Sequence, residues 1–212
     1  MKKLAGMPSS KIFVTGGASS GKSGFAENLA LELFNKYLNN SNIANGSISS
    51  TSGNLNGAVN CPSLHFIATA NPFTLDKEMK IKVEEHKKRR SDLFIAHEDF
   101  DDLRLEIENI YNSSNSQYCI ILVESLTMWL SGIFMEVSAY DLAYEKLTEL
   151  TACLKDVECS LIVISDLLSF NIVPADRYVR EFIRLNGIME QKLSAISDAA
   201  FCIIAGMPLK LK

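Results

Sequence analysis

Several features that mark membrane, secreted or nucleic-acid-binding proteins are missing from this chain of 212 residues. No apolar run approaches the roughly 20 residues that span a bilayer, so we expect no membrane span. The basic N-terminus, residues 1–7, is not followed by a long apolar stretch, so we expect no secretory signal. The net charge is −4 without a broad basic face, which argues against nucleic acid as the main ligand.

Cysteines are few, odd in number and widely spaced. The chain has five of them, at Cys61, Cys119, Cys153, Cys159 and Cys202. This spacing contains no CxxC pair and indicates free thiols rather than a disulfide framework or a cysteine metal site. Free thiols are typical of a reducing compartment, so we expect a cytoplasmic protein.

Apolar runs of strand length alternate with longer segments of helical period. This alternation predicts an α/β fold, with a mostly parallel sheet flanked by helices on both faces. We expect strands at residues 11–15, 64–69, 93–97, 118–123, 161–165 and 200–205. We expect helices at residues 22–37, 75–89, 100–111, 126–135, 140–155 and 175–196. The length fits one domain covering residues 1–212.

Residues 39–60 do not fit this pattern. Most of the segment is Asn, Ser, Gly and Thr, which bury too little apolar area to offset the entropy of ordering. We interpret it as a flexible insertion between the first helix and the second strand. Both a functional lid and an insertion without a role are compatible with its composition.

A glycine-rich phosphate-binding motif follows the first predicted strand. It matches G-x-x-x-x-G-K-[ST] and consists of Gly16, Gly17, Ala18, Ser19, Ser20, Gly21, Lys22 and Ser23. The strand before it and the helix after it are the context of a P-loop, in which backbone N–H groups and a helix N-terminus face phosphate oxygens. Lys22 would contact the β- and γ-phosphates, and Ser23 would ligate Mg²⁺. The other interpretation is a Gly/Ser turn that matches by chance.

Glu124 directly follows a fully apolar strand. A carboxylate in this place is costly unless a cation or hydrogen-bond donors satisfy it. We therefore expect Glu124 to act with Ser23 at the Mg²⁺ site, with a structural salt bridge as the alternative. The strand tips at Thr69, Ser125 and Asp166 should lie on the same edge of the sheet.

The predicted helix 75–89 ends in a histidine followed by four cations, His86, Lys87, Lys88, Arg89 and Arg90. The cations fit a helix C-terminus, where they complement the macrodipole. They also fit a triphosphate site in which His86 attacks phosphorus to form a covalent intermediate. The residues alone leave both interpretations open. We interpret His65 and His97 as structural.

The chain resembles the bifunctional adenosylcobinamide kinase / adenosylcobinamide-phosphate guanylyltransferase family of cobalamin biosynthesis. The resemblance excludes the Asn/Ser-rich insertion and covers most of residues 12–212. It is carried by the P-loop, the segment 66–70, the Asp76 to Arg90 segment with its His-cation ending, Glu124 to Ser131, Ile172-Val173-Pro174 and residues 198–208.

The resemblance implies an ATP- or GTP-dependent kinase step on adenosylcobinamide, followed by transfer of GMP from GTP to adenosylcobinamide phosphate. It implies that His86 carries GMP, that Lys22 is catalytic, and that the protein is a homotrimer. It implies nucleotide contacts, beyond the P-loop, at Thr69, Ala70, Asn71, Lys87, Lys88, Arg89, Arg90, Glu98 and Glu124.

The chain departs from the family pattern in three places. One is the long C-terminal helix, where Glu190-Gln191 stands in place of the family's Asn-Gln pair. Ser19 stands where arginine is usual, and after the fifth strand Leu167, Ser169 and Asn171 replace an acidic residue and two glycines. Because glycines permit positive φ, we expect the loop at 166–171 to have a different shape. A P-loop kinase of another small alcohol and a nucleotide-binding protein without turnover are therefore alternatives.

Overall fold

The computed structural model describes residues 9–40, 62–70, 77, 81, 83–84, 87–88, 90–114, 118–137, 139–168 and 173–212. Three residues predicted for the site, Asn71, His86 and Arg89, lie outside this part of the chain. The same holds for the insertion predicted at residues 39–60, apart from Asn39 and Asn40 at the end of the first helix.

The described residues form one seven-stranded sheet with the order β3-β2-β4-β5-β1-β6-β7. The strands are β1 (Lys11–Gly16), β2 (Ser63–Ala68), β3 (Ile95–His97), β4 (Cys119–Glu124), β5 (Ser160–Ile164), β6 (Ala199–Ile204) and β7 (Met207–Lys210). All neighbouring strands are parallel except β6 and β7, which are antiparallel. Strand β1 therefore lies between β5 and β6, which come much later in the chain.

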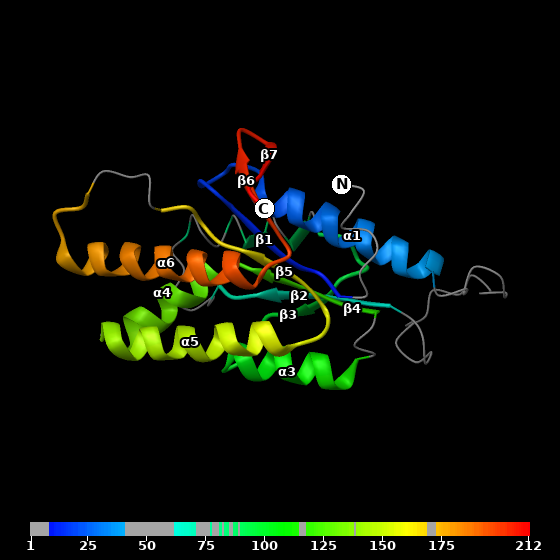
Figure 1. Ribbon diagram of the computed structural model, residues 1–212, viewed down its shortest axis with the longest axis horizontal. Coiled ribbons are helices and arrows are strands. Elements are labelled where there is room, and N and C mark those ends of the chain that lie inside the picture. The colour runs from blue at the N-terminus through cyan, green and yellow to red at the C-terminus, as the bar shows by residue number, and fades with distance from the viewer. Residues whose placement is uncertain are drawn as a thin grey trace.

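Helices cover both faces of the sheet (Figure 1). They are α1 (Lys22–Asn40), α3 (Leu103–Ser113), α4 (Leu126–Val137), α5 (Tyr140–Asp156) and α6 (Arg177–Ile196). Helix α1 packs on one face, and α3, α4, α5 and α6 pack on the other. None of the helices in the described ranges is long and apolar enough to cross a membrane.

The central strands are buried on both faces, which explains their continuous apolar sequence. In β4, Ile120 and Leu122 pack toward α1, whereas Ile121 and Val123 pack toward α3 to α6. Side chains alternate between the two faces of a strand, so such a strand needs apolar residues at every position. The predicted α/β fold with a mostly parallel, helix-covered sheet is confirmed.

The helix starts differ from the predictions where an aspartate caps the helix. Helix α3 begins at Leu103 rather than residue 100, because the Asp102 side chain accepts hydrogen bonds from the Arg104 and Leu105 N–H groups. Helix α6 begins at Arg177 rather than residue 175, because Asp176 accepts from the Val179 N–H. Both aspartates satisfy N–H groups that have no partner within the helix.

Strand β7 was not predicted. Its four residues are all exposed, and Pro208 lacks the N–H that a central strand needs. A strand at the edge of a sheet can be exposed and can lack an N–H donor. A tight turn with positive φ at Ala205 and Gly206 joins β7 to β6. The described cysteines, Cys119, Cys153, Cys159 and Cys202, are free, as predicted.

Candidate functional site

The P-loop connects β1 to α1 and needs glycine at two positions. A Cβ on Gly16 would lie 2.5 Å from the Ile203 carbonyl oxygen, which is too close for any side chain. Gly21 has φ +97°, a backbone conformation that other residues rarely adopt. The turn between β6 and β7 supports the loop from outside, because the Gly206 N–H donates to the Ser20 carbonyl over 2.9 Å. The loop thus has the strand before it and the helix after it that the motif predicted.

Lys22 begins helix α1 and points back toward the loop. Its Nζ donates to the Gly17 carbonyl oxygen at 2.8 Å and forms an ion pair with Asp166 Oδ1 at 2.7 Å. The residue is 8% exposed, and its remaining surface faces the cavity beside the P-loop. Lys22 is thus in place to contact a phosphate held by the loop.

Ser23 and Glu124 contact each other across the floor of the site. The Ser23 hydroxyl donates to Glu124 Oε1, and both residues line the same cavity. Oxygen ligands of this kind suit Mg²⁺, which usually takes one or two protein oxygens and completes its shell with phosphates and water. The described residues contain no cluster of three or more His, Cys, Asp or Glu side chains that could hold a metal alone. A metal here would therefore depend on the nucleotide for its other ligands.

A second group of cations lines the cavity on the side of β2 and β3. Glu98 binds both of them: Lys87 Nζ lies 2.6 Å from Glu98 Oε2, and Arg90 Nη2 donates to Glu98 Oε1 at 2.9 Å. The Arg90 guanidinium also stacks on the Phe66 ring, 4.4 Å from its centroid. Glu98 therefore holds the two cations at the cavity wall.

The ion pairs shift the pKa values of this group in the expected directions. The hydrogen bond that Lys87 donates to Glu98 raises the pKa of Lys87. Burial acts to raise the pKa of Glu98, but the hydrogen bonds from Lys87 and Arg90 outweigh it and lower the pKa below its usual range. Lys87 and Glu98 are therefore both charged at neutral pH.

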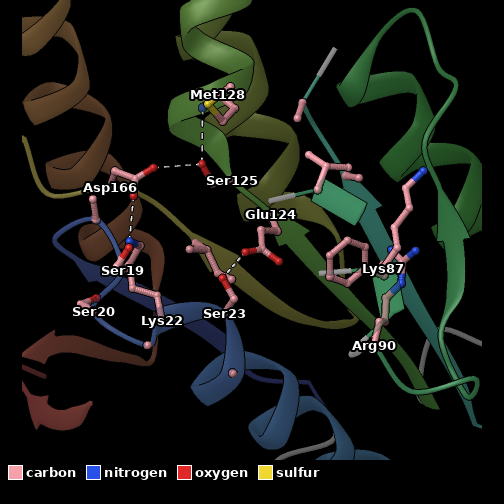
Figure 2. A pocket seen from close by; sticks show the side chains of 18 of the residues that line it. Ser19, Ser20, Lys22, Ser23, Lys87, Arg90, Glu124, Ser125, Met128 and Asp166 are labelled. Atoms are coloured by element: carbon pink, nitrogen blue, oxygen red, sulfur yellow. Dashed lines mark hydrogen bonds and ion pairs between the residues drawn. The ribbon is translucent and has the colours of Figure 1, made fainter. Parts of the chain in front are cut away.

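One cavity of about 800 Å³ contains the P-loop, Glu124 and the second cation group (Figure 2). Of the residues predicted to bind nucleotide, the described ones that line it are Ala18, Ser19, Ser20, Gly21, Lys22, Ser23, Ala70, Lys87, Arg90, Glu98 and Glu124. Gly16, Gly17, Thr69 and Lys88 are not among the lining residues. Thr69 instead ties β2 to β4, because its hydroxyl donates to the Ser125 carbonyl oxygen at 2.6 Å.

Asp166 is the main residue of the site that the sequence did not assign. It lies two residues after β5, and Glu124 is the last residue of β4, so an acidic residue at the end of an apolar strand was the signal for both. The contact with Lys22 depends on β5 lying next to β1, which no local pattern indicates. The cavity is also lined by residues for which the sequence predicted no function, including Phe66, Val83, Asp99 and Met128.

A half-buried carboxyl group lies behind the P-loop strand. Glu190 of α6 accepts hydrogen bonds from the Thr15 hydroxyl at 2.6 Å and from the Ser165 hydroxyl at 3.1 Å. Burial raises the pKa of Glu190, more than the two hydrogen bonds lower it. This carboxyl group connects α6 to the strands that carry the P-loop and Asp166.

Comparison with known proteins places these features in context. Residues 45–211 match the model of a family described as cobinamide kinase / cobinamide phosphate guanyltransferase. The bifunctional adenosylcobalamin biosynthesis protein CobP of Pseudomonas aeruginosa is 26% identical over 199 residues, which cover 94% of this chain and 95% of that protein. The bifunctional adenosylcobalamin biosynthesis protein CobU of Salmonella typhimurium is 22% identical over 213 residues, covering 95% of this chain and 99% of that protein.

A solved structure of a KaiC-like protein from the hyperthermophilic archaeon Pyrococcus horikoshii covers 91% of this chain. The aligned part is 70% of that protein's chain, the sequence identity is 14%, and the TM-score is 0.42.

Proposed function

The chain belongs to the cobinamide kinase / cobinamide phosphate guanyltransferase family, and from that premise we propose that it catalyses two steps of cobalamin biosynthesis. In the first, ATP or GTP phosphorylates the hydroxyl group of adenosylcobinamide. In the second, GTP donates GMP to adenosylcobinamide phosphate, which gives adenosylcobinamide-GDP and pyrophosphate. The observation that carries the proposal is a single cavity lined by cations from two parts of the chain, Lys22 in the P-loop and Lys87 with Arg90.

In the kinase step, the P-loop amides and Lys22 hold the β- and γ-phosphates and stabilise the charge that develops on the leaving diphosphate. Ser23 and Glu124 supply the oxygens that fit Mg²⁺. When bound there, Mg²⁺ would neutralise part of the phosphate charge.

In the guanylyl step, an imidazole nitrogen of His86 forms a bond to the α-phosphorus of GTP, and the bond to the β-phosphate breaks to release pyrophosphate. A phosphate oxygen of adenosylcobinamide phosphate then attacks the same phosphorus, and the P–N bond breaks to restore His86. Lys87 and Arg90 lie close to His86 in the sequence and line the cavity, which supports their contact with the GTP phosphates.

A labelling experiment tests the guanylyl step. With Mg²⁺ and GTP labelled at the α-phosphate, the wild-type protein should acquire an acid-labile, base-stable label that His86→Ala lacks. His97→Asn is the matched control, because His97 contacts His65 and Glu106 away from the P-loop, and it should label like the wild type. An unlabelled wild-type protein would refute the guanylyl step.

The kinase step is tested separately, with γ-labelled ATP or GTP and adenosylcobinamide. Label should appear in adenosylcobinamide phosphate. Transfer to simple alcohols but not to adenosylcobinamide would point to a kinase of another substrate. We also propose that the chain is a single domain and that the protein is a cytoplasmic homotrimer. Sedimentation velocity measures the oligomeric state.

A further inference from the structure

Asp166 has a position in the cavity that nucleotide binding alone does not explain. Its Oδ1 lies 2.7 Å from Lys22 Nζ, and its Oδ2 accepts a long hydrogen bond of 3.4 Å from the Ser125 hydroxyl (Figure 2). The side chain is 29% exposed and lines the cavity. A negative charge beside the phosphate-binding lysine competes with phosphate, so by itself it would weaken nucleotide binding.

The backbone of Asp166 is fixed from both sides. Its N–H donates to the Thr127 hydroxyl oxygen at 2.8 Å, and its carbonyl oxygen accepts from Asn186 Nδ2 at 3.0 Å. Thr127 and Asn186 are buried and hydrogen bonded to each other at 3.0 Å. The backbone that carries this carboxylate is therefore held by α4 and α6, independently of Lys22.

Nucleotide binding changes the surroundings of this carboxylate. In a P-loop site the lysine contacts the β- and γ-phosphates, so a group in contact with Lys22 lies next to the γ-phosphate. Two anions in such proximity repel each other unless a hydrogen-bond donor lies between them. The hydroxyl group of a phosphoryl acceptor is such a donor, and its oxygen would then face the γ-phosphorus.

Three other carboxylates near the cavity have hydrogen-bond or ion-pair partners of their own. Glu124 accepts from Ser23, and Glu98 is bound by Lys87 and Arg90 at the far end of the cavity. Glu190 is the remaining titratable group near Asp166; it hydrogen bonds to Thr15 and Ser165 and does not line the cavity. Asp99 also lines the cavity but follows β3 at the edge of the sheet, whereas Asp166 follows β5, the strand next to β1.

We propose that Asp166 is a catalytic residue of the kinase step and accepts the proton of the acceptor hydroxyl. This inference rests on the proposed kinase function. The hydroxyl oxygen forms a bond to the γ-phosphorus, the bond between that phosphorus and the bridging oxygen breaks, and its electron pair leaves on the nucleoside diphosphate. The proton moves to Asp166 and then to solvent, while Lys22 stabilises the charge on the leaving group.

The test compares Asp166→Asn, Asp166→Glu and the exposed control Asp141→Asn in three assays. For Asp166→Asn we expect kcat of adenosylcobinamide phosphorylation to fall about 10²-fold or more, as on removal of a general base. The KM for the nucleotide should stay the same or fall, because Lys22 loses its competing anion. Labelling of the protein by α-labelled GTP should be unchanged.

Two further readouts separate a proton acceptor from a structural ion pair. The wild-type kcat should decline at acid pH through one ionisation, and Asp166→Asn should lack this decline. Asp166→Glu should recover part of kcat because it keeps a carboxylate, and Asp141→Asn should match the wild type in every assay.

The outcomes distinguish failure of this inference from failure of the proposed function. If the wild type phosphorylates adenosylcobinamide and Asp166→Asn keeps kcat within about threefold, Asp166 is a partner of Lys22 and not the proton acceptor. If the wild type phosphorylates no alcohol at all, the proposed kinase function fails and the role of Asp166 fails with it. Loss of GTP labelling in Asp166→Asn would also overturn the assignment, since it would indicate a general defect of the site.

Discussion

The stability of the folded chain should decline in weak acid because of one buried histidine. His65 is 7% exposed, its Nδ1 lies 3.0 Å from His97 Nε2, and His97 Nδ1 lies 2.5 Å from Glu106 Oε1. Burial, and after it the neighbouring His97, lowers the pKa of His65 from its usual 6.5 to about 4. The unfolded chain therefore binds a proton at His65 near pH 6.5, whereas the folded chain binds it only near pH 4.

The magnitude follows from the difference between the two pKa values. Because the folded pKa is lowered, this contribution to the free energy of unfolding is fully present above pH 6.5 and is lost as the pH falls toward 4. The full difference corresponds to about 3 kcal/mol, of which about 2 kcal/mol is lost between pH 7 and pH 5. A loss of this size is a large fraction of the stability of a typical domain.

Urea unfolding followed by far-UV circular dichroism, at several pH values between 7.5 and 4.5, measures this effect. The comparison is with His65→Asn, which keeps a hydrogen-bonding side chain but does not titrate in this range. Groups that do not contact His65, such as Glu98, contribute equally to both proteins, so the difference between the two curves reports His65 together with its contact to His97. If the free energies of unfolding of wild type and variant fall in parallel from pH 7 to pH 5, the reasoning is wrong.

Three other predictions concern the P-loop and the core. Gly16→Ala should abolish nucleotide binding measured by calorimetry, because the new Cβ would lie 2.5 Å from the Ile203 carbonyl oxygen; binding at wild-type affinity would contradict this geometry. Glu190→Gln should raise Tm at pH 7.5 but not at pH 4, because burial raises the pKa of Glu190 and its favourable contribution is lost as the pH rises through that pKa; equal changes at both pH values would refute it. Leu147→Ala, at a fully buried position, should lower the free energy of unfolding by about 3 kcal/mol in urea titrations, and a loss below about 1 kcal/mol would show that the cavity collapses.

The sequence predicted the sheet well where strands are buried on both faces. β4 and β5 were located within one residue at each end, because central parallel strands are apolar at every position. The sequence failed at the edges: β3 is two residues shorter than expected, and β7 was missed. Edge strands need neither continuous apolar sequence nor a complete set of N–H donors, so their residues resemble those of loops.

One part of the candidate site was predictable from local sequence patterns, and another part was not. The P-loop and Glu124 are local patterns, and the structure brings Ser23 and Glu124 into contact as expected for a metal site. The pairing of Asp166 with Lys22 depends on β5 lying next to β1, whereas Glu98 binds Lys87 and Arg90 from nearby in the sequence. The first contact joins residues far apart in the sequence, and periodicity carries no information about it or about the side-chain partners of Glu98. The role of His86 stays a prediction.

The position of β1 sets an order of events during synthesis of the chain. Lys11 pairs with Leu161 and Ile12 with Ala199, and the Ser20 carbonyl oxygen accepts from the Gly206 N–H. The P-loop residues therefore leave the ribosome long before the segments that give them their shape. A nascent chain cannot form the phosphate site until residues 199–206 have been translated and have paired with β1. Nucleotide capture by this protein is thus restricted to chains whose translation has passed β6 and the turn that follows it.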